Sequence, residues 1–564
     1  MKDLIHNKVW LGMAALLCLC SVSRTEAKVK LPALVSDGMV LQREQPLKIW
    51  GTADAGETVQ LTFLKGKKAK EAYTATADSH GAWSIELPAM KAGGPYRIQV
   101  NDIELKDVLV GDVWLCSGQS NMELPVRRVM DMFAEEISTY HNEKIRHLIV
   151  PKTYNFHEPQ KDMPATSWKA LTQENVMEFS ALAYFFAKEM YERTGVPVGI
   201  INSSWGGTPV EAWMSEESLK EFPQYINDKR LYEDDAYCKH IKEVEGESFR
   251  RWNAALYRGD AGLHETTPWY AANYDDSAWQ TVDMFANTWG NNGLNAIGGS
   301  HWLRQSVEIP STWNGKEATL RLGCLVDADS VYVNGQFVGT TSYQYPPRIY
   351  RIPSGLLKAG KNSITVRLIS NGGQPAFVRE KPYKIILNGQ KDGIPTESST
   401  APREINLKRE WKYRPGAPMP QAPGMMFFCY KPVCLYNAMI APLKEYGVKG
   451  VIWYQGESNV SRRNEYADLL TAMMADWRKT FDAPELPFYI VELADFLHPN
   501  DTGGRKAWAE MRQEQAKAAE QSSNAYLIKN SDLGEWNDIH PLDKKTLGKR
   551  VAEAIKNGQL ITNN

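Results

Sequence analysis

The sequence predicts an α/β fold in which a mostly parallel sheet is flanked by helices, with two β modules attached to it. Strands that lead into turns and then helices begin at about residue 108 and return from 448. Such βα alternation is typical of a parallel sheet covered on both faces. Alternating, turn-rich segments occupy 28–107 and 262–395, and 564 residues are too many for one ordinary core.

The amino terminus, residues 1–27, has the features of an export signal. Lys2 and Lys8 are basic, an apolar stretch runs from 9 to 20, and the segment ends on the small residue Ala27. No other segment is long and apolar enough to span a bilayer. We therefore expect a secreted or periplasmic protein with no membrane span.

Composition excludes several classes of partner and cofactor. The net charge of −2 argues against binding to nucleic acid or to an anionic membrane. Five cysteines would remain after cleavage, too few for a disulfide framework, and none forms a Cys/His cluster with metal-site spacing. We expect no metal and no cofactor. Cys429 and Cys434 could pair across a short loop, or could equally be buried thiols.

The first β module, 28–107, is predicted as a β-sandwich. Its apolar residues alternate with polar neighbours, and Gly/Pro turns separate the runs. The alternating runs are Leu47/Ile49, Val59/Leu61/Phe63, Trp83/Ile85/Leu87 and Tyr96/Ile98/Val100.

The α/β domain is predicted in two parts, 108–261 and 396–564. A helix is expected in each part, with its apolar residues on one face. These residues are Leu182, Phe185, Phe186 and Met190 in the first part, and Tyr466, Leu470, Met473 and Trp477 in the second. Further strands are expected at 198–202, 448–454, 487–491 and 525–528.

The second β module, 262–395, is predicted as a β-sandwich inserted into a loop of the α/β domain. Strand-like alternation occurs at 318–322, 329–336 and 362–368. Loops tolerate such insertions because the entropy of loop closure grows slowly with length. Asp327 and Asp329 could suggest a calcium site, or could be the polar edge of a strand.

Ser120 is the predicted nucleophile. A β-branched strand from 108 ends in the turn Gly118-Gln119-Ser120-Asn121-Met122, which would place a hydroxyl where open α/β sheets bind ligands. Met122 departs from the G-x-S-x-G turn of α/β-hydrolases. A serine in such a turn could also be merely a hydrogen-bonding turn residue.

Three further segments supply the other groups that acyl transfer needs, which are a base and donors for an oxyanion. A Gly206-Gly207 pair follows the strand at 198–202, and Gln455 follows the strand at 448–454. His540 lies in a loop before the terminal helix, two residues after Asp538. Each alone could be an ordinary turn or surface residue.

Together the four segments resemble the sequence blocks of SGNH-type carbohydrate esterases, and in particular the sialate O-acetylesterase family. The resemblance covers 108–215 and 425–555, including the strings at 209–213, 435–443 and 450–459. The two β modules match larger bacterial members of that family. The inserted module is similar to the jelly-roll, galactose-binding-like modules found beside many glycosidase domains.

The resemblance implies a role for each of these residues. Ser120 attacks an acetyl carbonyl and His540 takes its proton. The N–H groups of Ser120 and of Gly207 or Gly206, with the side chain of Gln455, hold the oxyanion. Many SGNH enzymes carry aspartate three residues before the histidine, where this chain has Asn537. Either Asp538 or a backbone carbonyl would therefore orient His540.

The resemblance implies a serine esterase that removes O-acetyl groups from sugars, O-acetylated sialic acids above all. An acetylxylan or other polysaccharide deacetylase is the alternative, and a catalytically inactive carbohydrate-binding protein is a third. Trp205, Trp453 and Tyr454 are expected to contact the sugar, although Trp453 or Tyr454 must face the core if their strand is buried. The sequence does not give the oligomeric state.

Overall fold

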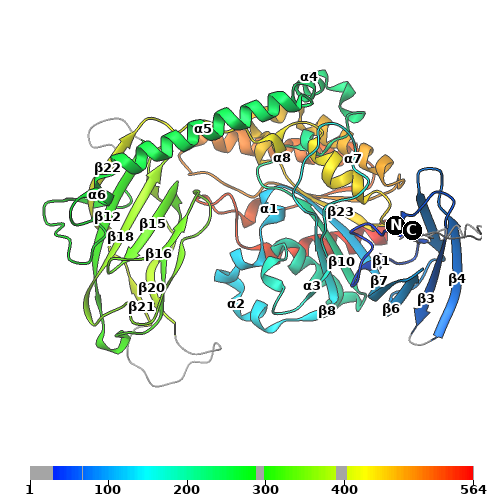
Figure 1. Ribbon diagram of the computed structural model, residues 1–564, viewed down its shortest axis with the longest axis horizontal. Helices are drawn as coiled ribbons and strands as arrows, with labels where there is room; N and C mark the ends of the chain where they lie inside the picture. Colours follow the sequence, from blue (N-terminus) through cyan, green and yellow to red (C-terminus); the bar gives the residue numbers. More distant parts are fainter. Residues whose placement is uncertain (1–28, 66–67, 287–297, 389–402, 563–564) are drawn as a thin grey trace, which may run out of the picture.

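A computed structural model describes residues 29–65, 68–286, 298–388 and 403–562. The predicted export signal lies outside the described residues. Figure 1 shows the α/β domain in the centre, the amino-terminal strands at one end and the inserted strands at the other. Helix α5 (Asp235–Gly259) runs along one side of the molecule and reaches the inserted strands.

The sheet of the α/β domain has the order β25-β24-β23-β7-β10-β8-β9. All neighbouring strands in it are parallel except β9, which is antiparallel to β8. The bounds are β7 (Ile103–Gly118), β8 (Asn142–Ile149), β9 (Lys169–Leu171), β10 (Val198–Ser204), β23 (Gly450–Tyr454), β24 (Phe488–Val491) and β25 (Ala525–Ile528). The predicted α/β class is confirmed, and four predicted strands form where the pattern placed them.

Helices cover both faces of this sheet, as βα alternation predicts. Trp114 and Cys116 of β7 share one core with α3 (Ala181–Thr194) and α9 (Lys544–Thr562). Val113 and Leu115 share the opposite core with α7 (Tyr466–Thr480) and α8 (Thr502–Gln521). Successive side chains of a strand point to opposite faces, so a strand covered on both sides is apolar throughout.

The amino-terminal strands are continuous with the α/β domain, because β7 belongs to both. Its first half pairs with β1 (Val40–Gln42) and β6 (Gly93–Val100), and its second half is the central strand of the parallel sheet. The expected boundary at 107/108 therefore falls inside a single strand. The remaining strands are β2 (Leu47–Thr52), β3 (Thr58–Lys65), β4 (Lys68–Thr76) and β5 (Ala82–Leu87).

The described part of the inserted region contains two large antiparallel sheets and one two-stranded pair. The larger has the order β11-β22-β12-β18-β15-β16 and the smaller β17-β13-β20-β21. Leu303 and Val366 of the larger sheet pack with Leu320 and Ile385 of the smaller in one core. The bounds are β11 (Gln280–Asp283), β12 (Gly298–Ile309), β13 (Ala318–Leu322), β15 (Ala328–Val333), β16 (Gln336–Thr341), β17 (Ile349–Ile352), β18 (Gly360–Ser370), β20 (Tyr383–Leu387), β21 (Glu404–Asn406) and β22 (Glu410–Met419); a separate pair is β14 (Leu325–Val326) and β19 (Ala376–Phe377).

The inserted sheets extend beyond their expected end at residue 395. Strand β22 pairs with both β11 and β12, although its sequence contains Pro415, Gly416 and Pro418. Proline and glycine weaken a strand pattern, so the local sequence did not reveal this pairing.

Several smaller expectations can be compared with the structure. Asp329 is buried and forms an ion pair with Arg348, so it is a structural carboxylate and not a calcium ligand. Cys429 and Cys434 are free, buried thiols. Within the described ranges, no group of three His, Cys, Asp or Glu side chains could hold a metal ion. No described helix is both long and apolar enough to cross a membrane.

Candidate active site

Three parallel strands end side by side at one edge of the sheet. Gly118 of β7 is in register with Ser204 of β10 and with Tyr454 of β23. A Cβ on Gly118, which has φ +133°, would lie 2.1 Å from the carbonyl oxygen of Tyr454. Only glycine allows this approach. Half-buried Ser120 comes two residues later, as the first residue of α1 (Ser120–Glu123).

The loop after β10 lies directly against Ser120. A Cβ added to Gly206 would be 3.4 Å from the Ser120 Cβ. The Gly206 N–H donates a 2.7 Å hydrogen bond to Glu123, whose other oxygen accepts from Lys152 at 2.6 Å. Because this N–H is already bonded to a carboxylate, the geometry favours Gly207 over Gly206 as the glycine donor.

Gly207 keeps its N–H group free of a protein acceptor. Its φ is +78°, and a Cβ there would lie 1.9 Å from the hydroxyl oxygen of Tyr430, so no larger residue fits. Within the described chain, neither the Ser120 N–H nor the Gly207 N–H donates to a protein acceptor. These two groups are available to a developing negative charge.

Gln455 does not have the geometry of an oxyanion donor. Its side chain is fully buried, and Nε2 donates to the Thr208 carbonyl at 3.2 Å and to Asn459 Oδ1 at 2.7 Å. Both amide hydrogens are therefore used. Its Oε1 accepts from the Tyr466 hydroxyl at 2.9 Å. The amide ties the β23 loop to the Gly207 loop in this arrangement, and its role as an oxyanion donor stays a prediction.

Gln119 is an amide that the sequence reasoning passed over. Its Oε1 accepts from the N–H groups of Gly456 and Ser458, both at 3.3 Å. Its Nε2 has no acceptor among the described residues. Gln119 therefore has a fixed amide, adjacent to Ser120, with its donor end unused.

His540 is buried and neutral. Burial, together with the positive charges of Arg128 and Lys544, lowers its pKa to about 3. Asp538 Oδ1 accepts from the His540 backbone N–H at 2.9 Å but lies 3.8 Å from Nδ1, which has no hydrogen-bond partner. As described, Asp538 shapes the loop and does not bond the imidazole.

Asn121 connects the Ser120 turn to the His540 loop. Its Nδ2 donates to the Ile539 carbonyl at 2.9 Å and to Glu457 at 2.7 Å. Its Oδ1 accepts from Lys544 at 2.9 Å. Since Asn121 and Ile539 are the chain neighbours of Ser120 and His540, these bonds hold the two proposed catalytic residues on adjacent loops. The sequence signal was only the position of Asn121 beside Ser120.

Two charged residues, half-buried Glu457 and buried Lys544, contact this asparagine. Burial raises the pKa of Glu457, and burial lowers the pKa of Lys544 to about 8. Lys544 also donates to the Pro541 carbonyl at 2.7 Å.

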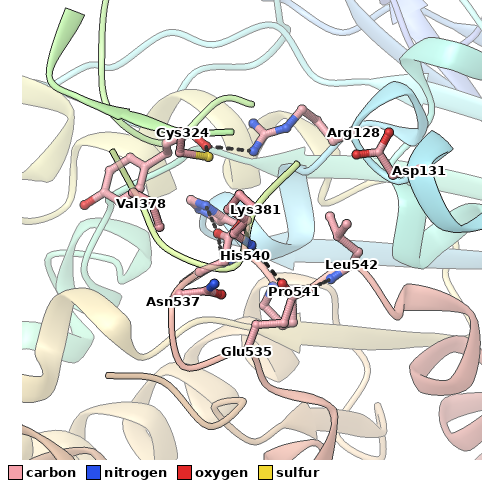
Figure 2. A network of polar contacts seen from close by, with 12 residues as sticks. Arg128, Asp131, Cys324, Val378, Lys381, Glu535, Asn537, His540, Pro541 and Leu542 are labelled. Carbon is pink, nitrogen blue, oxygen red and sulfur yellow. Dashed lines mark hydrogen bonds and ion pairs between the residues drawn. The ribbon is translucent and has the colours of Figure 1, made fainter. Parts of the chain in front are cut away.

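The inserted module contacts the His540 loop directly (Figure 2). Lys381 forms ion pairs with Glu535 at 2.9 Å and with Asp538 at 3.1 Å. The ring of Tyr345 packs edge-on against His540, with centroids 5.3 Å apart. No sequence pattern indicates these contacts, because they join segments about 150 to 200 residues apart.

The predicted sugar-contacting aromatics differ in exposure. Trp205 is half-buried, with Lys152 5.7 Å from its ring centre. Trp453 and Tyr454 are fully buried on opposite faces of β23. Their predicted substrate contact is wrong, because the strand is covered by helices on both sides.

The fold is an α/β domain with a cluster of polar loops at one edge of its parallel sheet. Residues 110–257 and 425–557 match the family model described as carbohydrate esterase, sialic acid-specific acetylesterase. These two segments belong to that family, so the resemblance drawn from the motifs is confirmed.

Known proteins similar to this chain agree with the family assignment. The sialate O-acetylesterases of Pongo abelii and Homo sapiens are 34% and 33% identical over 208 residues. Each match covers 34% of this chain but only 40% of the relative. A crystal structure of a carbohydrate acetylesterase from Xanthomonas citri is 25% identical, with a TM-score of 0.53, over 93% of this chain and 74% of that one.

Proposed function

We propose that this protein is a serine esterase that removes O-acetyl groups from carbohydrates, with O-acetylated sialic acids as preferred substrates. The observation that carries the proposal is the meeting of Ser120, the free Gly207 N–H and the His540 loop at one edge of a family-matched sheet. Ligand sites of open α/β sheets lie at this edge.

The reaction proceeds through an acetyl-enzyme. The Ser120 oxygen forms a bond to the acetyl carbonyl carbon while His540 takes the hydroxyl proton. The sugar oxygen then leaves with a proton returned by His540. Water, deprotonated by the same imidazole, releases acetate and restores Ser120. The lowered pKa of His540 keeps the imidazole neutral, which is the form that can accept a proton.

The oxyanion is held by the N–H groups of Ser120 and Gly207. These donors are free of protein acceptors within the described chain, so they need no rearrangement when charge develops. The Nε2 of Gln119 is the remaining amide donor beside them and takes the part first assigned to Gln455.

His540 and Ser120 act as a dyad in this scheme. The 3.8 Å separation between Asp538 and His540 Nδ1, and the engagement of the other Asp538 oxygen by Lys381, favour a loop-shaping role for Asp538. The sugar itself packs against three partly exposed aromatics, Trp205, Tyr345 and Tyr430, which lie beside Gly206, His540 and Gly207 respectively.

The remaining features of the chain fit an exported sugar esterase. We propose that the strands of 28–107 and the inserted sheets are accessory β-sandwich modules, the latter of the jelly-roll, galactose-binding-like type. We also propose that residues 1–27 direct the protein to a secreted or periplasmic location, because their pattern is that of an export signal.

Side-by-side acetate release at sub-saturating substrate tests the proposal. We expect kcat/KM for 9-O-acetylated sialic acid to exceed that for acetylated xylo-oligosaccharides by at least about tenfold, which is roughly 1.4 kcal/mol of transition-state binding. Equal rates would reduce the function to a general sugar acetylesterase. A preference for the xylo-oligosaccharide would favour the polysaccharide deacetylase. No turnover of any acetate ester would leave a carbohydrate-binding protein.

A further inference from the structure

Arg128 lies beside the proposed base with an incompletely bonded guanidinium. It ends the 3₁₀ turn Val126–Arg128, and Figure 2 shows its side chain extending toward Cys324 of the inserted module, near Lys381 and His540. One terminal nitrogen donates to the Tyr345 carbonyl at 3.2 Å. The ring of the same tyrosine packs on His540, so Tyr345 contacts both groups.

Three neighbouring cations are paired with carboxylates, whereas Arg128 is not. Lys381 pairs with Glu535 and Asp538, Arg321 with Asp131, and Lys152 with Glu123. Among the described residues, no carboxylate lies within 4.0 Å of the Arg128 nitrogens, and its buried Nε has no hydrogen-bond acceptor. A partly buried, unpaired charge is unfavourable unless a ligand supplies its partner.

We propose that Arg128 binds the carboxylate of an acidic sugar and thereby selects O-acetylated sialic acids over neutral acetylated sugars. The inference rests on the proposed esterase function and names the group that its substrate must carry. A guanidinium presents a planar fork that matches the two oxygens of a carboxylate. The shared contact with Tyr345 places this subsite next to His540, within the reach of one sugar bound at Ser120.

A purely structural role would not require this arrangement. The bond to the Tyr345 carbonyl uses one N–H of five, and a glutamine amide could supply it equally well. The Nε–H, which would form one arm of the fork, is the group left without an acceptor.

The test compares 9-O-acetylated N-acetylneuraminic acid with its methyl ester, which lacks the negative charge. For each variant, the ratio of kcat/KM for the acid to kcat/KM for the methyl ester is measured. The ratio is internal to one protein sample, so loss of folded protein cancels. The variants are Arg128→Gln and Arg128→Lys. The matched control is Arg127→Gln, which removes an exposed neighbouring arginine that pairs with Glu178.

The wild-type enzyme should prefer the acid by about tenfold to a hundredfold, the range expected for hydrogen bonding between charged groups. Arg128→Gln should bring the ratio to about one, Arg128→Lys should retain part of the preference, and Arg127→Gln should keep the wild-type ratio. A wild-type ratio near one, or an Arg128→Gln ratio equal to that of the wild type, overturns the carboxylate role while the esterase function stands. A wild-type enzyme that releases acetate from neither compound overturns the proposed function and this role with it.

Discussion

Replacing Asn121 with alanine should destabilise the α/β domain strongly, because one buried amide joins three separate loops. The substitution removes the bonds to Glu457, Lys544 and the Ile539 carbonyl. Hydrogen bonds to charged groups contribute about 1.5–3 kcal/mol each, and the partners left behind here are buried Lys544 and half-buried Glu457. Allowing for relaxation, we expect a loss of about 3–5 kcal/mol in the free energy of unfolding.

Urea unfolding followed by tryptophan fluorescence measures this loss. Asn121→Asp separates lost volume from lost bonds, since it keeps the size but turns an acceptor toward the Glu457 carboxylate and the Ile539 carbonyl; it should lose at least about 2 kcal/mol. Asn253→Ala, at an exposed asparagine of α5 with one bond to the Phe249 carbonyl, is the control and should change stability by less than about 0.5 kcal/mol. An Asn121→Ala protein within about 1 kcal/mol of the wild type would refute the role of this asparagine in joining the loops.

Four further outcomes are expected. Gln455→Ala should lower the free energy of unfolding by about 2–4 kcal/mol and leave kcat of the folded protein within about tenfold of the wild type. Gln119→Ala should lower kcat by roughly 10²-fold. If Gln455→Ala has the larger effect on kcat, Gln455 is the oxyanion donor. Asp538→Asn should lower kcat by about tenfold, and a loss near 10⁴-fold would indicate a working triad. Lys381→Met should lower kcat/KM about tenfold for every acetate ester, because it removes the ion pairs between the inserted module and the His540 loop. An unchanged kcat/KM would mean that these ion pairs do not position His540. Because the pKa of His540 is lowered to about 3, kcat/KM should not fall as the pH is lowered through 6.5. The free energy of unfolding should decrease as the pH falls from 6.5 toward 3, because in that range only the unfolded histidine binds a proton. A fall in kcat/KM centred at pH 6.5 would contradict the buried, neutral imidazole.

The sequence predicted the central sheet and the placement of its loops well, because those features are local. Buried strands followed by glycine turns are visible as patterns, and they brought Ser120, Gly207 and Gln455 to one edge. The pattern could not distinguish a donor from a structural amide. Whether the Gln455 amide can donate to a substrate depends on whether Asn459 and the Thr208 carbonyl already accept from it, and this depends on how the neighbouring loops are placed.

Features that depend on contacts between distant segments could not be predicted from the sequence. The inserted strands reach residue 419 only because β22 finds partners in β11 and β12 despite its prolines. Trp453 and Tyr454 were candidates for sugar contact because they precede Gln455, but cover from helices on both faces buries them. Arg128 and Lys381 lie in no recognisable motif. Their proposed roles follow from the contacts between the inserted module and the segments around His540.

Covalent labelling of Ser120 tests the central claim most directly. A fluorophosphonate reacts with an activated serine and forms a covalent adduct that resists hydrolysis. Intact-mass and peptide analysis of this adduct locate the nucleophile. The account predicts one label per chain, on Ser120, with a parallel loss of acetate release. Ser120→Ala should melt at the wild-type temperature, remain unlabelled and be inactive. His540→Ala should be labelled far more slowly than the wild type. A label on another residue, or a Ser120→Ala protein with activity within about tenfold of the wild type, would contradict the account.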